Sequence, residues 1–178
     1  TTEVGVISLG GLVHANSIRI AGDKVDEVIT NHIRSKHGLL IGDTTAEEIK
    51  KQIGSAHPET DVGEISIRGR SSYQGLPKEI VVNSQEIREA LQDTLEQIVT
   101  AIRQALETTP PELSADLIEN GITLTGGGAL LRGLDILIHG ETGLKVTVAN
   151  EPLLCVAKGC GVALDYLADN RLYLNRIK

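Results

Sequence analysis

The sequence is short of aromatic residues and lacks several residue types altogether. Its 178 residues include three tyrosines and no phenylalanine, tryptophan or methionine. Apolar residues still make up 40% of the chain, so a core must be built from isoleucine, leucine, valine and alanine. This length allows one large domain or two small subdomains. Because no initiator methionine is present, we expect a processed chain or a piece of a longer protein.

Clustered positive charge and long apolar runs are also absent. The net charge is −7, with acidic and basic residues mixed along the chain. Nucleic acid is therefore not expected as a partner, because phosphate binding needs clustered lysine and arginine. No apolar run approaches the length that spans a membrane, and no signal peptide opens the sequence. Any membrane attachment must come from outside this chain.

Motifs of self-contained enzymes and metal sites are missing as well. The histidines show no metal-ligand spacing, and we find no Walker A motif, Rossmann fingerprint or Gly-x-Ser-x-Gly elbow. Cys155 and Cys160 fall five residues apart in one expected helix, which points them toward different faces. That spacing argues against a disulfide or a zinc site and predicts buried thiols in a reducing cytoplasm.

The most informative stretch that is present runs from residue 122 to residue 135. A short β-branched run leads into Gly126, Gly127 and Gly128, and an apolar helical pattern follows. A strand, a glycine turn and a helix start would aim unpaired N–H groups at one point, as a cradle for phosphate or a nucleotide sugar. The alternative is a tight βα turn that needs glycine only for its backbone conformation.

Periodicity predicts the elements before this stretch. Residues 4–20 predict a hairpin around a Gly-Gly turn, and a helix capped by Asp23 and ended by Gly38 follows. Thr44 with Glu47, or Thr45 with Glu48, predicts a capping box for a second helix. Residues 64–68 and 79–82 predict a second hairpin.

A long helix and an α/β segment complete the pattern. Asn83 and Glu86 have the spacing of a capping box, and a regular apolar stripe extends to a Thr-Thr-Pro-Pro stop at residues 108–111. A strand at residues 146–149 and a final helix from Pro152 close the chain, with Gly159 and Gly161 expected at close packing contacts. The order predicts an α/β subdomain with a mixed sheet, interrupted by an α+β insertion.

The charged residues of the second helix allow two interpretations. Glu47, Glu48 and Lys50 lie within one turn, and local sequence favours a solvated face with an ion pair. They could instead meet Thr1, Thr2 and the three glycines around one nucleotide. Sequence spacing does not decide between these interpretations.

Several segments resemble the MreB family of bacterial actin homologues. They are residues 1–4, 17–27, 45–50, 53–56, 75–77 and 109–135. The most specific is Thr-Gly-Gly-Gly-Ala-Leu-Leu-Arg-Gly-Leu-Asp at residues 125–135. The resemblance extends from residue 1 to about residue 167. The sequence departs from the family at Val25, where methionine is usual, and at Lys24, where an acid is usual.

The resemblance implies the C-terminal lobe of an actin/Hsp70-type ATPase fold, with a ribonuclease H-like mixed sheet and flanking helices. Subdomain IIA would comprise residues 1–38 and 84–168, the inserted subdomain IIB residues 39–83, and a C-terminal tail residues 169–178. ATP and Mg²⁺ would bind in the cleft between two lobes, with Mg²⁺ held mainly by the nucleotide and the other lobe. No metal ligand is assigned to this chain.

The same resemblance assigns residues to the nucleotide. Thr1 and Thr2 would lie beside the β- and γ-phosphates and position phosphate or water. Gly22 and Asp23 would border the ribose, and Glu47, Glu48 and Lys50 would flank the adenine and ribose. The α-phosphate and adenine would lie over a loop that contains Gly126, Gly127, Gly128 and Ala129.

The resemblance further implies a cytoplasmic filament formed head to tail by copies of the whole protein. Such filaments lie at the inner face of the cell membrane and organise cell-wall elongation and inner-membrane proteins, with the membrane anchor in the other lobe. The alternative is an Hsp70-like or sugar-kinase-like ATPase lobe that acts on a client or a small substrate. As a complete two-lobed protein the molecule would be an ATPase, whereas this fragment alone is expected to be inactive.

Overall fold

The computed structural model describes residues 1–168, so the predicted tail at residues 169–178 lies outside the described part. The first half contains β1 (Thr2–Ser8), β2 (Gly11–Ile18), α1 (Gly22–His37), β3 (Leu39–Leu40), α2 (Asp43–Ile53), η1 (Pro58–Thr60), β4 (Glu64–Ser71) and β5 (Pro77–Asn83). The second half contains α3 (Ser84–Glu107), α4 (Pro111–Asn120), β6 (Ile122–Leu124), η2 (Gly127–Leu130), α5 (Leu134–Thr142), β7 (Val146–Val148), η3 (Pro152–Leu154) and α6 (Cys155–Ala168).

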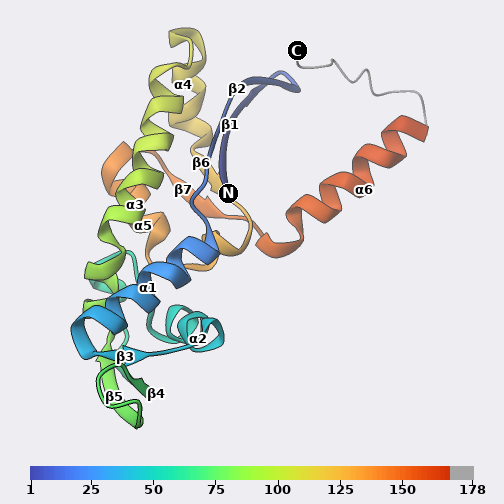
Figure 1. Cartoon of the computed structure of the whole chain (residues 1–178). Coiled ribbons are helices and arrows are strands. Elements are labelled where there is room, and N and C mark those ends of the chain that lie inside the picture. The colour runs from blue at the N-terminus through green and yellow to red at the C-terminus, as the bar shows by residue number, and fades with distance from the viewer. Residues whose placement is uncertain (169–178) are drawn as a thin grey trace.

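The described strands form three separate small sheets (Figure 1). β1 and β2 form the predicted antiparallel hairpin, and β4 and β5 form the second hairpin, whose other edge pairs with β3. β6 and β7 pair in parallel through the α5 crossover. Antiparallel and parallel pairs are therefore both present, as a mixed architecture requires, but no hydrogen-bonded ladder joins β1 to β6 within residues 1–168.

A single aliphatic core joins α1, α2, α3 and α5. Its largest fully buried side chains are aliphatic, and each contributes roughly 1.5–3 kcal/mol to folding by leaving water. They include Ile29, Ile33, Leu39, Ile49, Ile87, Leu91 and Ile138. The predicted apolar stripe of α3 forms the centre of this core. Because the core also includes side chains from residues 39–83, the division into subdomains IIA and IIB stays a prediction.

The helix ends match the sequence in some places and not in others. Asn83 caps α3 by accepting a hydrogen bond from the Glu86 N–H at 2.9 Å, and α1 ends at Gly38 with φ of 61°. The capping prediction for Asp23 is wrong, because α1 begins at Gly22 and Ala21 is its N-cap. Both capping boxes predicted for α2 are wrong as well. That helix begins at Asp43 after Gly42, which places the two threonines inside its first turn.

The final helix, α6, extends away from the rest of the molecule (Figure 1). The prediction of buried thiols is wrong, because Cys155 is half-buried and Cys160 is exposed. Close packing at Gly159 and Gly161 is also wrong, since an added Cβ would meet nothing within 4 Å at either position. Both errors have the same cause, which is that α6 projects from the body and has η3 as its main neighbour. In the described part of the chain, no helix combines the length and apolarity needed to cross a membrane.

A buried carboxylate joins α1 to α3. Oε1 of Glu86 accepts hydrogen bonds from Nε2 of His32 at 2.9 Å and Nε2 of His37 at 2.6 Å. Nζ of Lys36 lies 3.3 Å from Oε2. Burial raises the pKa of Glu86, but the hydrogen bonds from His37, His32 and Lys36 outweigh it and hold the pKa below its ordinary value.

We predict that Glu86→Gln lowers the free energy of unfolding by about 2 kcal/mol at neutral pH, because it removes the charge that these donors face. The wild-type advantage should be lost as the pH falls below the ordinary value of 4.5, since the folded-state pKa lies beneath it. Urea unfolding between pH 3 and pH 7 measures this. The control is Glu89→Gln, which changes an exposed carboxylate on the same helix. Equal losses in both variants would contradict the prediction.

Candidate functional site

The glycine stretch forms a loop and a short helical turn before α5. Gly126 follows β6 with φ of 79°, and its N–H donates to the carbonyl of Pro152 at 2.9 Å. The chain then makes the single turn η2, and Gly133, with φ of 73°, precedes α5. The prediction that one helix starts at the glycines is therefore wrong in detail. The left-handed Gly133 separates η2 from the helix.

The middle of this loop presents open backbone. Gly127 and Gly128 are exposed, and a Cβ added to Gly128 would meet nothing within 4 Å. A Cβ added to Gly127 would approach Leu153 at 3.4 Å. The first N–H groups of a helical turn have no acceptor inside that turn, so this loop can offer donors to an anion. Ala129, in contrast, is buried and helps to fix the loop on the core.

The segment that follows α2 holds the far side of the loop in place. The N–H of Ala56 donates to the carbonyl of Arg132 at 2.8 Å, and Ser55 and Arg132 form a parallel bridge. Side chains of this segment pack so closely on the loop that a Cβ on Gly133 would lie 2.3 Å from Oγ1 of Thr60. Glycine is therefore required here both for its positive φ and for space.

Lys50 connects α2 to the start of α1. Its Nζ atom lies 2.8 Å from Oδ2 of Asp26 and 3.5 Å from the carbonyl of Gly22. The side chains of Lys50 and Asp26 are 20% and 18% exposed. The structure thus brings together Lys50 and Gly22, two of the residues that the resemblance assigns to the ribose side.

Glu47 and Glu48 lie on the solvated face of α2. Glu47 pairs with Lys51 at 2.8 Å, and this hydrogen bond and charge lower the pKa of Glu47. Glu48 accepts a hydrogen bond from the amide of Gln52 at 2.8 Å. The solvated position of both carboxylates agrees with the local interpretation of the sequence, but their partners are Lys51 and Gln52, four residues on, and not Lys50.

The two N-terminal threonines differ in their surroundings. The hydroxyl of Thr2 donates to the carbonyl of Ile20 at 2.6 Å, which places the start of β1 beside the connection from β2 to α1. Thr1 is exposed. Thr2, Gly22 and Lys50 therefore follow one another along one side of the molecule, linked through backbone carbonyls.

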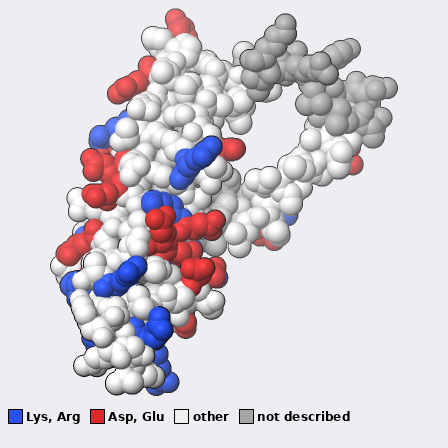
Figure 2. Space-filling view, in the orientation of Figure 1, with Lys and Arg blue, Asp and Glu red and all other residues white. Residues whose placement is uncertain are grey.

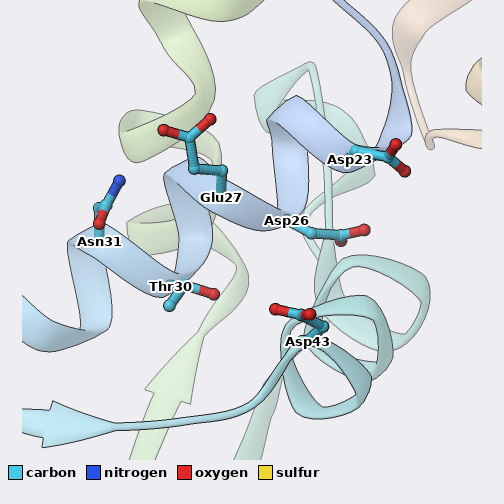
Figure 3. Close-up of a pocket in the computed structure, with 6 residues that line it drawn as sticks. All are labelled: Asp23, Asp26, Glu27, Thr30, Asn31 and Asp43. Carbon is cyan, nitrogen blue, oxygen red and sulfur yellow. The ribbon is translucent and has the colours of Figure 1, made fainter.

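An acidic cleft of about 430 Å³ lies beside this line, between α1 and α2 (Figure 3). It is lined by Asp23, Asp26, Glu27, Thr30, Asn31 and Asp43. Acidic side chains gather on this part of the surface in Figure 2. Asp23 was expected near the site, but sequence reasoning missed Asp26. The available signal was its position three residues after Asp23 on the same helix.

The site thus has two ends of different character. The glycine loop offers exposed backbone N–H groups, and the cleft offers carboxylates, of which Asp26 and Glu27 are paired with lysines. Such a pair of ends suits a ligand that carries phosphates at one end and hydroxyl groups at the other. No three His, Cys, Asp or Glu side chains within residues 1–168 are grouped so that they could hold a metal ion.

Solved structures with the same fold define the class of protein. A crystal structure of MreB5 of Spiroplasma citri bound to ADP matches with a TM-score of 0.89 and 37% identity, over 94% of this chain and 51% of that one. The AMPPNP-bound form of MreB5 matches with a TM-score of 0.88 over 96% and 52%. The MamK double helical filament matches with a TM-score of 0.73 and 26% identity, over 94% and 50%. The chain is therefore a lobe of the actin/Hsp70-type ATPase fold.

Sequence relatives define the family. The family model described as MreB/Mbl protein matches residues 1–171. The cell shape-determining protein MreB of Escherichia coli (strain K12) is 54% identical over 167 residues, which cover 94% of this chain and 48% of that protein. The cell shape-determining protein Mbl of Bacillus subtilis (strain 168) is 52% identical, over 93% of this chain and 50% of that protein. The chain belongs to the MreB/Mbl family, and it spans about half the length of these relatives.

Two glycine substitutions test which positions of the loop are tightly packed and which are open. We predict that Gly133→Ala destabilises the fold by about 3 kcal/mol, because the new Cβ meets Thr60 and the backbone is left-handed. Gly128→Ala should change stability by less than about 0.5 kcal/mol, because its Cβ enters open space. Thermal or urea unfolding measures both. A stable Gly133→Ala protein would contradict the geometry described here.

Proposed function

We propose that this chain is the C-terminal lobe of an ATP-binding, filament-forming bacterial actin that maintains rod cell shape by organising cell-wall elongation at the inner membrane. The observation that carries the proposal is the open backbone at Gly127 and Gly128, followed by a turn held against the segment after α2. One structural relative, MreB5 of Spiroplasma citri, was crystallised both with ADP and with AMPPNP, which supports nucleotide as the ligand.

The proposed orientation of ATP follows from the two ends of the site. The phosphates lie toward the exposed backbone of Gly127 and Gly128, which Gly126 and Ala129 flank in sequence, and toward Thr1 and Thr2 of the first hairpin. The ribose lies near Gly22, Asp23 and Lys50. Glu47 and Glu48 border the adenine side, and to do so their side chains must leave the partners that they have in this structure.

Mg²⁺ fits this proposal only as an ion held by the nucleotide and the other lobe. Within residues 1–168 no three metal ligands are grouped, and the proposal therefore assigns Mg²⁺ to the nucleotide and the other lobe. When bound, Mg²⁺ would neutralise phosphate charge. The residues of this chain hold and orient the nucleotide. We also propose that residues 39–83 form subdomain IIB and that residues 1–38 and 84–168 form subdomain IIA.

A structural relative that forms a filament supports the cytoskeletal part of the proposal. The filament of MamK has the same fold, and a head-to-tail contact that does not close into a ring produces a filament. The whole protein would assemble in the cytoplasm against the inner face of the membrane, where it would meet cell-wall elongation and inner-membrane proteins. The membrane contact would come from the other lobe. Membership of the MreB/Mbl family favours this function over an Hsp70-like or sugar-kinase-like lobe.

We predict that Gly128→Ala weakens binding of Mg-ATP to the protein at least about tenfold, because its Cβ occupies space that the phosphates approach. The matched control is Gly140→Ala, a substitution into open space on α5 that is away from the loop. Calorimetric titration of both variants measures the effect. Equal affinities for wild type, Gly128→Ala and Gly140→Ala would rule out the loop as the phosphate site.

We also predict that the complete two-lobed protein sediments as polymer in Mg-ATP and that Gly128→Ala abolishes this nucleotide-dependent fraction. In the proposed function, polymer forms only when the nucleotide site is closed. Pelleting at increasing protein concentration measures it, with Gly140→Ala as the control. A wild-type protein that stays monomeric at high concentration would exclude the filament.

A further inference from the structure

Lys50 and Asp26 form one of the ion pairs of the described residues in which both partners are largely buried, as Arg88 and Asp61 do. The Nζ–Oδ2 distance is 2.8 Å, and the two side chains are 20% and 18% exposed. The exposed pair between Arg68 and Glu79 on the second hairpin is, in contrast, 83% and 51% exposed. A buried pair depends strongly on both members, because removing one leaves the other charge without compensation.

Asp26 depends on Lys50 more than the distance alone indicates. Its second oxygen, Oδ1, is buried and has no hydrogen-bond partner. Lys50 is therefore the neighbour that compensates this carboxylate. Lys50 in turn is held on two sides, by Oδ2 of Asp26 and by the carbonyl of Gly22 at 3.5 Å. An ammonium has three donors, so one N–H of Lys50 is left for a ligand.

The surroundings decide which ligand group that N–H suits. Asp23, Glu27 and Asp43 line the same cleft as Asp26 (Figure 3). Two lysines pair with these carboxylates, Lys50 with Asp26 at 2.8 Å and Lys24 with Glu27 at 2.9 Å, so negative charge is in excess. A phosphate would be repelled by this excess of negative charge, whereas an uncharged hydroxyl would not. The cleft end of the site is thus suited to sugar hydroxyls, and the phosphates must point toward the glycine loop.

We infer that Asp26 is a positioning residue for nucleotide binding, which fixes Lys50 against the start of α1 so that Lys50 donates to a ribose hydroxyl. The inference rests on the proposed nucleotide-binding function and deepens it. Asp26 acts through Lys50 and need not touch the ligand. Its removal should therefore weaken recognition of the ribose and leave recognition of the base unchanged.

The test is a double-mutant cycle with Asp26→Asn and Lys50→Met, measured as the dissociation constants of adenosine and adenine by NMR titration of the chain. Asp26→Asn should weaken adenosine binding about tenfold and leave adenine binding unchanged. In the Lys50→Met background, Asp26→Asn should have no further effect. Glu79→Gln, which breaks the exposed pair, is the control and should change neither constant.

Each outcome separates the inference from the function on which it rests. Loss of adenosine and adenine binding together in Asp26→Asn would show a merely structural role, and additive effects of the two substitutions would show that Asp26 does not act through Lys50. Either result overturns the inference and leaves nucleotide binding in place. If the wild-type chain binds neither ligand, the inference fails because this lobe does not hold the ribose by itself, and Mg-ATP binding by the complete two-lobed protein remains the test of the proposed function. The double variant has no unpaired charge and therefore serves as the check on folding.

Discussion

The structure depends on the close contact between the loop after the three glycines and the segment that follows α2. The N–H of Ala56 donates to Arg132, and Gly133 leaves no room for a Cβ beside Thr60, so the loop is held against this segment. Helix α2 itself carries Lys50, which contacts the start of α1. Together these contacts set the relative positions of the glycine loop and the cleft.

The glycine loop and the cleft differ in charge, so they suit different parts of a ligand. The glycine loop offers backbone donors and no side-chain charge at Gly127 and Gly128, so it suits an anion without selecting one base or sugar. The cleft is lined by four carboxylates, of which Asp26 is paired with Lys50 and Glu27 with Lys24. A nucleotide has a matching arrangement, with charged phosphates at one end and ribose hydroxyls nearer the other. The acidic net charge of the chain is thus compatible with binding a polyanion at one end.

Sequence patterns predicted most of the elements, because hairpins and the stripe of α3 are local features of period two and 3.6. They placed several helix starts wrongly, as at Asp23, because a glycine before the acid can already adopt helical geometry. They also could not show that α6 projects from the body, since its apolar residues fit a buried helix equally well. In the site, the glycine loop was visible as a motif. Asp26 was missed because its partner lies 24 residues away, and only the packing of α1 on α2 brings the two together.

The most direct test of the account follows both ends of the site at once. Backbone amide signals of the chain would be recorded by NMR during titration with Mg-AMPPNP. The account predicts that Gly127 and Gly128 at one end, and Gly22 and Lys50 at the other, shift together and fit a single dissociation constant. Shifts confined to one end, or two unrelated dissociation constants, would contradict a single nucleotide site that spans the loop and the cleft.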